Sequence, residues 1–131
     1  MTLRYAVIAD IVGSRTLTNR AEAQRIFEAA LERAAEGLGL LEAPYPTVGA
    51  EFPAVAYSLE DALLLTLRAQ LLLPPQLQLR FGIGAGRIEE FSSGVHRQAQ
   101  ARPRAGEGTY LQAGWAWWAA RAANNRAHDV P

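Results

Sequence analysis

The chain has 131 residues, enough for one domain with a hydrophobic core and hardly enough for two, so we expect a single domain over residues 1–131. Thirteen acidic residues balance thirteen basic ones, and because every basic residue is arginine, the sequence excludes a lysine nucleophile, a Schiff base and a P-loop lysine. The absence of cysteine excludes disulfides and thiolate metal sites. The N-terminal apolar run is interrupted by Asp10 and is too short for a signal peptide or a membrane span, which predicts a cytoplasmic protein without membrane association.

The first two expected elements are a strand over residues 3–9 and a helix that begins after Asn19. The strand alternates weakly and ends in β-branched residues, a pattern that favours a central strand buried on both faces. Asn19 and Glu22 form a capping box, and apolar residues follow at helical spacing until Gly37 and Gly39 end the helix.

A hairpin, a second helix and another strand follow. Residues 45–48 and 52–57 are β-prone runs on either side of a turn, and because each run contains a proline, we expect one of these strands at an edge of the sheet. Ser58 and Asp61 form a second capping box, which opens a leucine-rich helix that two consecutive prolines end. Residues 76–85 alternate cleanly, which predicts a strand.

This order of elements, β-α-β-β-α-β, predicts an α+β fold of the ferredoxin-like type, an antiparallel four-stranded sheet with both helices on one face. Right-handed crossovers fix the topology. With the first strand in the centre, its end at Asp10 and the hairpin turn at residues 49–51 share one edge of the sheet. A polar run over residues 91–108 has the length of a flexible or functional loop, and a last helix is expected over about residues 114–126.

Several polar residues and glycines could have either a structural or a functional role, judged from their chemistry alone. Asp10, before a Gly-Ser pair, is either a turn former or a ligand, and Glu51 is either a solvated hairpin residue or a ligand. Arg97, Arg102 and Arg104 either close over an anionic ligand or belong to a solvated loop. Three alternating glycines in the strand at residues 76–85 and just beyond it favour the close approach of a helix or a ligand to the sheet: Gly82, Gly84 and Gly86.

Four motifs in sequence carry a family resemblance. They are Asp-Ile-Val-Gly-Ser-Arg at 10–15, Gly-x-Glu-Phe at 49–52, Arg-Phe-Gly-Ile-Gly at 80–84 and Gly-x-Ala-Trp-Trp-x-Ala-Arg at 114–121. Together, and over nearly the whole chain, they resemble the SatD family. That family is similar to the class III nucleotidyl cyclases and the GGDEF diguanylate cyclases, which place an aspartate after the first strand and a second acidic residue in the hairpin.

The resemblance implies a site for a metal and a nucleotide at this sheet edge. Asp10 would bind Mg²⁺ or Mn²⁺ through its carboxylate, because hard cations that bridge phosphates prefer oxygen ligands, and Glu51 is the candidate for the second metal carboxylate. The Ile11 carbonyl would add a further ligand, and three backbone amides would form an anion-binding nest. The implied nucleotide-binding set is Ile11, Val12, Gly13, Ser14 and Arg121.

The hairpin departs from the family pattern. SatD-like sequences read Gly-Asp-Glu-Phe at this turn, whereas this chain has Ala50 in place of the aspartate. Neighbouring residues of a strand point to opposite faces, so Glu51 is expected to aim away from the position that the missing carboxylate would occupy. Trp118 stands where cyclases carry an asparagine. A second metal ligand is therefore expected to be lost, together with two-metal catalysis.

Three functions follow as hypotheses. The first is a degenerate, non-catalytic module that binds a nucleotide or phosphate and has a regulatory role. The second is a metal-dependent nucleotidyl cyclase or transferase that acts on ATP or GTP, with Asp10 and Glu51 as metal ligands. The third is a structural or transcription-related adaptor. Trp115, Trp117 and Trp118 cannot all share one helix face, which favours a homodimer contact at the last helix, and nucleic-acid binding by this chain alone is not expected.

Overall fold

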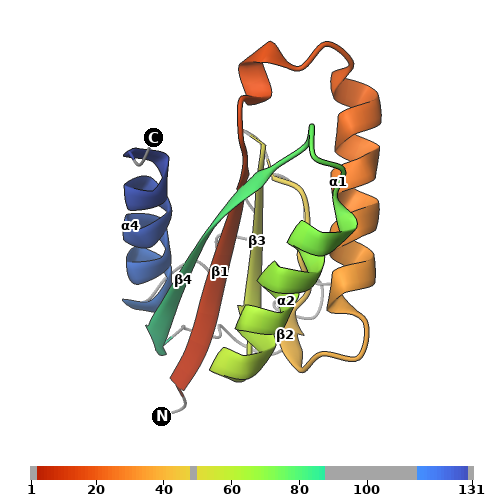
Figure 1. The fold of residues 1–131 in the computed structure, drawn as a ribbon. Coiled ribbons are helices and arrows are strands. Elements are labelled where there is room, and N and C mark those ends of the chain that lie inside the picture. Colours follow the sequence, from red (N-terminus) through yellow and green to blue (C-terminus); the bar gives the residue numbers. More distant parts are fainter. Residues whose placement is uncertain (1–2, 48–49, 88–114, 130–131) are drawn as a thin grey trace.

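The computed structural model describes residues 3–47, 50–87 and 115–129, in which four strands form one antiparallel sheet. The strand order is β2-β3-β1-β4, so β1 and β3 are the central strands (Figure 1). The predicted α+β class, the antiparallel sheet and the central position of the first strand are thus confirmed. The elements are β1 (Leu3–Ile11), the 3-10 turn η1 (Ser14–Thr16), α1 (Arg20–Ala35), β2 (Leu40–Glu42), β3 (Glu51–Ala56), α2 (Leu59–Leu72), β4 (Leu79–Arg87) and α4 (Trp115–Asp129).

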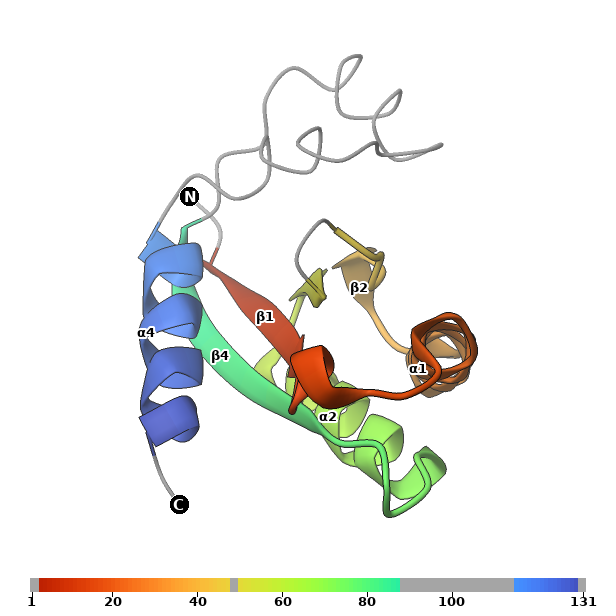
Figure 2. The same cartoon turned by 90° about the horizontal axis from the view of Figure 1, so that it is seen from above.

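Helices cover both faces of the sheet. α1 and α2 lie on one face, and α4 packs on the other, against β4 and β1 (Figure 2). The third layer distinguishes the molecule from a plain two-layer sandwich. This layer covers the second apolar face of β1, whose side chains are buried on both faces. Val7 and Ala9 belong to the core under α1 and α2, whereas Ala6 and Ile8 belong to a smaller cluster under α4.

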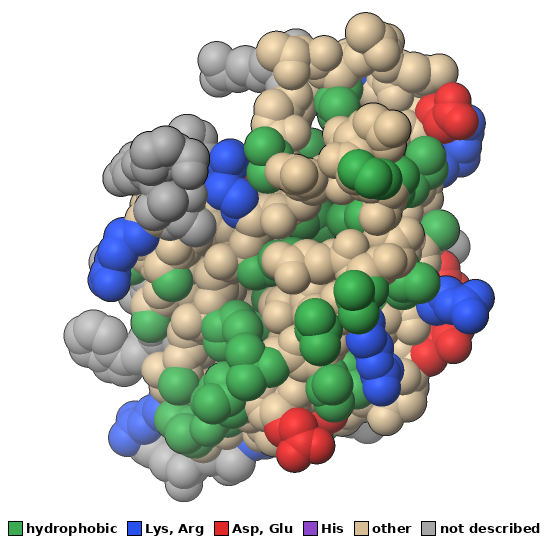
Figure 3. All heavy atoms as spheres, in the orientation of Figure 1, with side chains coloured by type: hydrophobic (Ala, Val, Ile, Leu, Met, Phe, Trp, Pro, Cys, Tyr) green, Lys and Arg blue, Asp and Glu red, His purple; other side chains and the backbone are tan. Residues whose placement is uncertain are grey.

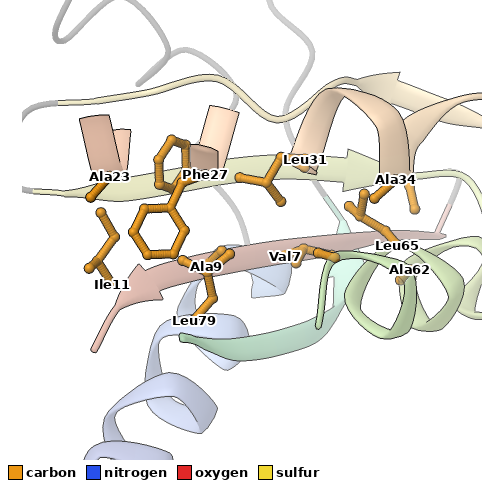
Figure 4. Packing of buried hydrophobic residues seen from close by; sticks show 14 residues of the cluster. Val7, Ala9, Ile11, Ala23, Phe27, Leu31, Ala34, Ala62, Leu65 and Leu79 are labelled. Atoms are coloured by element: carbon orange, nitrogen blue, oxygen red, sulfur yellow. The ribbon is translucent and has the colours of Figure 1, made fainter. Parts of the chain in front are cut away.

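The main core cluster lies between the sheet and the two helices α1 and α2 (Figure 4). Phe27 of α1 and Phe52 of β3 are its largest buried side chains, and their ring centroids lie 6.4 Å apart. Leu65 of α2 is buried in the same cluster. Burial of these apolar side chains is the principal free-energy gain that holds the helices on the sheet.

The two predicted N-terminal caps are present. The Asn19 side chain accepts a hydrogen bond from the Glu22 backbone N–H at 3.1 Å, and the Ser58 hydroxyl accepts one from the Asp61 N–H at 3.1 Å. After α1 the chain reverses at Gly37, which has a left-handed φ of 76° that glycine adopts without a steric penalty. The sequence therefore specified both helix starts correctly.

The hairpin was only partly predicted, because the strand expected over residues 45–48 is wrong. β2 lies earlier, at Leu40–Glu42, and the described part of the expected region, residues 45–47, contributes only an isolated bridge between Thr47 and Glu51. Pro44 and Pro46 cannot donate to a ladder, since proline has no backbone N–H. β4 likewise starts at Leu79 rather than residue 76, because residues 75–76 form a turn, and it runs on to Arg87.

The last helix, expected over residues 114–126, is present as α4 and continues to Asp129. The polar run at residues 91–108, with Arg97, Arg102 and Arg104, lies outside the described residues, as do the side chains of the three tryptophans. Among the helices that the structure describes, none is long and apolar enough to span a bilayer.

Candidate functional site

The candidate site lies where β1 ends. Asp10 stands directly opposite Glu51 of β3 on one side and directly opposite Arg80 of β4 on the other. Directly opposite residues of antiparallel strands point to the same face of a sheet. Asp10 is two residues after Ile8, which is buried under α4, so all three side chains belong to the α4 face.

Each of the two carboxylates on this face is paired with an arginine. Arg80 Nη2 donates to Asp10 Oδ2 at 3.3 Å, across neighbouring strands. Arg121 of α4 donates from Nη1 to Glu51 Oε2 at 2.9 Å and from Nη2 to Oε1 at 3.4 Å, a bidentate pair. The site is therefore an alternating set of two carboxylates and two guanidinium groups with no net charge.

The position of Arg121 depends on how α4 docks on the sheet. Asn124, one helical turn later and buried, donates from Nδ2 to the Ile8 carbonyl at 3.1 Å and to the Arg80 carbonyl at 3.2 Å. Gly82 lets the helix approach, because a Cβ at this position would overlap the Ala120 carbonyl oxygen. The predicted close approach at the strand glycines is thus confirmed at Gly82, with a helix as the neighbour.

Sequence reasoning missed the role of Asn124. Trp118 was the position that corresponds to the cyclase asparagine, counted from the glycine before the helix. The available signal was the three-residue spacing between Arg121 and Asn124, which places both side chains on one face of a helix. Two polar side chains on the helix face that packs against a glycine-containing strand indicate that the helix forms hydrogen bonds with the sheet.

The turn after β1 has the backbone geometry of an anion-binding nest. Gly13 adopts left-handed dihedral angles, φ 66° and ψ 33°, and is followed at once by the right-handed turn η1. Its carbonyl accepts from the Thr16 N–H at 3.0 Å and from the Thr16 hydroxyl at 2.9 Å. The Val12 N–H donates to the Gln78 carbonyl at 2.9 Å, so of the three expected amides only those of Gly13 and Ser14 remain for a phosphate.

Ala50 and Glu51 differ from the expectation in orientation. Glu51 was expected to aim away from the site, but it is the residue in register with Asp10 and shares its face. Ala50 adopts a left-handed φ of 65° and packs against the main core cluster on the opposite side of the sheet. The irregular backbone at Ala50 thus returns the glutamate to the site, and it places position 50 against apolar neighbours.

A divalent metal does not fit the side chains as they stand. Among the described residues there is no group of three or more acidic, histidine or cysteine side chains that could hold a metal ion. Both carboxylates are engaged with guanidinium groups, which a cation would have to displace. The Arg80 Nε is buried and has no hydrogen-bond partner among the described residues.

No protein-family model and no curated protein sequence matches this chain. The candidate site therefore depends on its own geometry, in which the sequence-predicted residues fall into two groups. Asp10, Glu51 and Arg121 meet on the α4 face, and Gly13 and Ser14 form the turn that begins three residues after Asp10.

Proposed function

We propose that this protein is a regulatory module, similar to SatD-family proteins, that binds the phosphates of a nucleotide at the end of β1 without metal-dependent turnover. The observation that carries the proposal is the pairing of both candidate metal ligands with arginine, Asp10 with Arg80 at 3.3 Å and Glu51 with Arg121 at 2.9 Å. Carboxylates that bind Mg²⁺ must be open to the ion. Here guanidinium groups hold both carboxylates, so a phosphate would bind by competing for the guanidinium donors and not through a metal.

Two features favour a phosphate as the ligand. The nest at Gly13 and Ser14 directs backbone donors to an anion, and the guanidinium of Arg121, whose side chain is 49% exposed, is within reach of solvent. A phosphate has the same bidentate acceptor geometry as a carboxylate, so it can compete with Glu51 for Arg121, at the cost of leaving the Glu51 carboxylate without its partner. Such an exchange changes the contact between α4 and β3, which gives the ligand a regulatory effect.

Calorimetric titration with ATP and GTP in the presence of EDTA tests this function. We expect binding in the millimolar range or tighter, and at least a tenfold loss in Arg121→Ala, because one bidentate charge-assisted contact is worth about 1.5–3 kcal/mol. Arg25→Ala is the matched control, since Arg25 is exposed on α1, and it should bind as the native protein does. Absence of binding at millimolar nucleotide contradicts the proposal and leaves the metal-dependent enzyme and the structural adaptor as the remaining classes.

A metal-dependent nucleotidyl cyclase or transferase is the second candidate, and the register of Asp10 with Glu51 favours it. In this case Mg²⁺ or Mn²⁺ would lie between the two carboxylates after Arg80 and Arg121 turned to the phosphates. Pyrophosphate release from ATP or GTP with Mn²⁺ separates the two functions. Turnover by the native protein that disappears in Asp10→Ala would overturn the non-catalytic proposal, whereas metal-independent binding without pyrophosphate supports it.

A further inference from the structure

The outer face of α2 carries a row of exposed leucines. Leu59, Leu63, Leu67 and Leu71 recur every four residues, and each is 47 to 75% exposed, with Leu72 beside them at 42%. Figure 3 shows hydrophobic side chains gathered over this helix. We call these five residues the leucine stripe. Residues four apart lie on one helix face, and the opposite face of α2 already packs on the core through Ala62, Leu65 and Ala69.

We infer that the leucine stripe is the interface of a two-fold symmetric dimer in which α2 packs antiparallel against α2 of a second copy. Leu63 of one copy then meets Leu67 of the other, and Leu59 meets Leu71. This pairing is self-complementary, as a two-fold interface requires. The inference does not depend on the proposed nucleotide site, which lies on the other face of the sheet.

Charge at the two ends of the stripe identifies the second copy as the partner. The first turn of α2 is acidic, with Glu60 exposed and Asp61 half-buried. The other end borders a groove of about 350 Å³ between α1 and α2, lined by Arg33, Glu36, Arg68, Leu71 and Leu72. Antiparallel packing places the acidic first turn of one copy over this groove, whose net charge is positive.

The groove is also shaped to receive a side chain of the second copy. Arg68 is held at its edge, because Nη1 donates to the Glu36 carbonyl at 2.9 Å and to the Ala34 carbonyl at 3.4 Å. Leu59 of the second copy fits against Leu71 and Leu72, with Glu60 beside Arg33 and Arg68. An anionic membrane would require an excess of basic residues around the stripe, which its mixed flanks do not provide.

The size of the stripe is consistent with a weak to moderate dimer. Exposed apolar patches beyond a few hundred Å² mark interaction sites, and a stable interface buries about 800 Å² on each partner. The leucine stripe alone does not reach that area. The polar flanks of α2 and the end of α1 must therefore be buried too. The contact between Glu60 and Arg33 then lies inside the interface and not at its solvent-exposed rim.

Sedimentation velocity over a range of concentrations, on the full chain, tests the dimer. We expect a concentration-dependent dimer for the native protein and a monomer for Leu67→Glu, with Ala21→Glu as the matched control because Ala21 is exposed at the start of α1, about 18 Å along the helix from Arg33. A native protein that stays monomeric overturns the inference, whether or not it binds vesicles or another protein. A dimer that survives Leu67→Glu overturns it as well, because another surface then holds the copies together.

Charge reversal and cross-linking test the antiparallel geometry. Glu60→Arg and Arg33→Glu should each weaken the dimer at least several-fold, and the double variant should restore it. The chain has no cysteine, so single cysteines can be introduced cleanly. Leu59→Cys and Leu71→Cys lie about 18 Å apart along the helix, so neither should cross-link alone, and a mixture of the two should give disulfide-linked heterodimers. Cross-linking of each variant with itself instead indicates parallel packing and overturns the proposed geometry.

Discussion

Gly82 of β4 and Ala120 of α4 are in direct backbone contact, because a Cβ on Gly82 would overlap the Ala120 carbonyl oxygen. It would also lie 2.6 Å from the backbone nitrogen of Asn124. Backbone atoms cannot move aside as the end of a flexible side chain can. This contact therefore fixes how closely α4 approaches the sheet, and through α4 it fixes the position of Arg121.

We expect Gly82→Ala to destabilise the protein by about 2 kcal/mol, because the added methyl forces α4 away from β4. Urea denaturation followed by circular dichroism measures the change in the free energy of unfolding. Gly39→Ala is the control, since a Cβ there meets the Asp61 Oδ2 at 2.9 Å, a side-chain atom that can shift at the cost of the hydrogen bond it accepts from the Ser58 hydroxyl. Equal losses in the two variants would show that α4 is not held against Gly82.

Removal of the Asn124 side chain tests the bond between α4 and the two strands. Asn124→Ala leaves the Ile8 and Arg80 carbonyls without this donor, and we expect a loss of about 1–3 kcal/mol in the free energy of unfolding. Asn125→Ala changes the same side chain at the next, exposed position, and should alter stability by less than about 0.5 kcal/mol. Thermal unfolding of the two variants side by side distinguishes them, and a harmless Asn124→Ala would contradict the docking described here.

Local signals in the sequence predicted most of the fold. The caps at Asn19 and Ser58 involve residues three apart, so they can be read without knowledge of the rest of the chain. The position of β2 could not be predicted in this way, because its three residues are a strand only through their pairing with β3. Proline alone did not decide which run pairs, because Pro53 lies within the central strand β3, whereas the run with Pro46 forms no strand among its described residues.

The candidate site was predictable in its location and not in its contacts. A central first strand places Asp10 near the hairpin, whatever the details of the turn. Register decides that Glu51 rather than Ala50 faces Asp10, and register here follows from the left-handed backbone at Ala50. The contact of Arg121 with Glu51 spans 70 residues and depends on the docking of α4, which no local pattern specifies.

The two ion pairs of the site should differ in their response to salt. A double-mutant cycle of Glu51→Ala and Arg121→Ala should give a coupling of about 0.2–1 kcal/mol that falls as salt is added, because the Arg121 side chain is about half exposed. The cycle of Asp10→Ala and Arg80→Ala should be less sensitive to salt, since these side chains are 24% and 21% exposed. An equal salt dependence of the two coupling energies would contradict the idea that the Asp10–Arg80 pair is better shielded from solvent. Chemical denaturation with urea, which is uncharged, keeps the ionic strength under control.

The backbone at Ala50 provides a substitution that should stabilise the protein. Alanine with a φ of 65° pays a steric penalty of about 1–2 kcal/mol that glycine does not pay. Ala50→Gly loses a small apolar contact and gains chain entropy in the unfolded state, so we expect a net gain of about 0.5 kcal/mol in the free energy of unfolding. The same change at Ala122, exposed within α4, should cost about 1 kcal/mol. Opposite shifts in the urea midpoint of the two variants confirm the left-handed turn, and a loss at both positions would mean that Ala50 has an ordinary backbone.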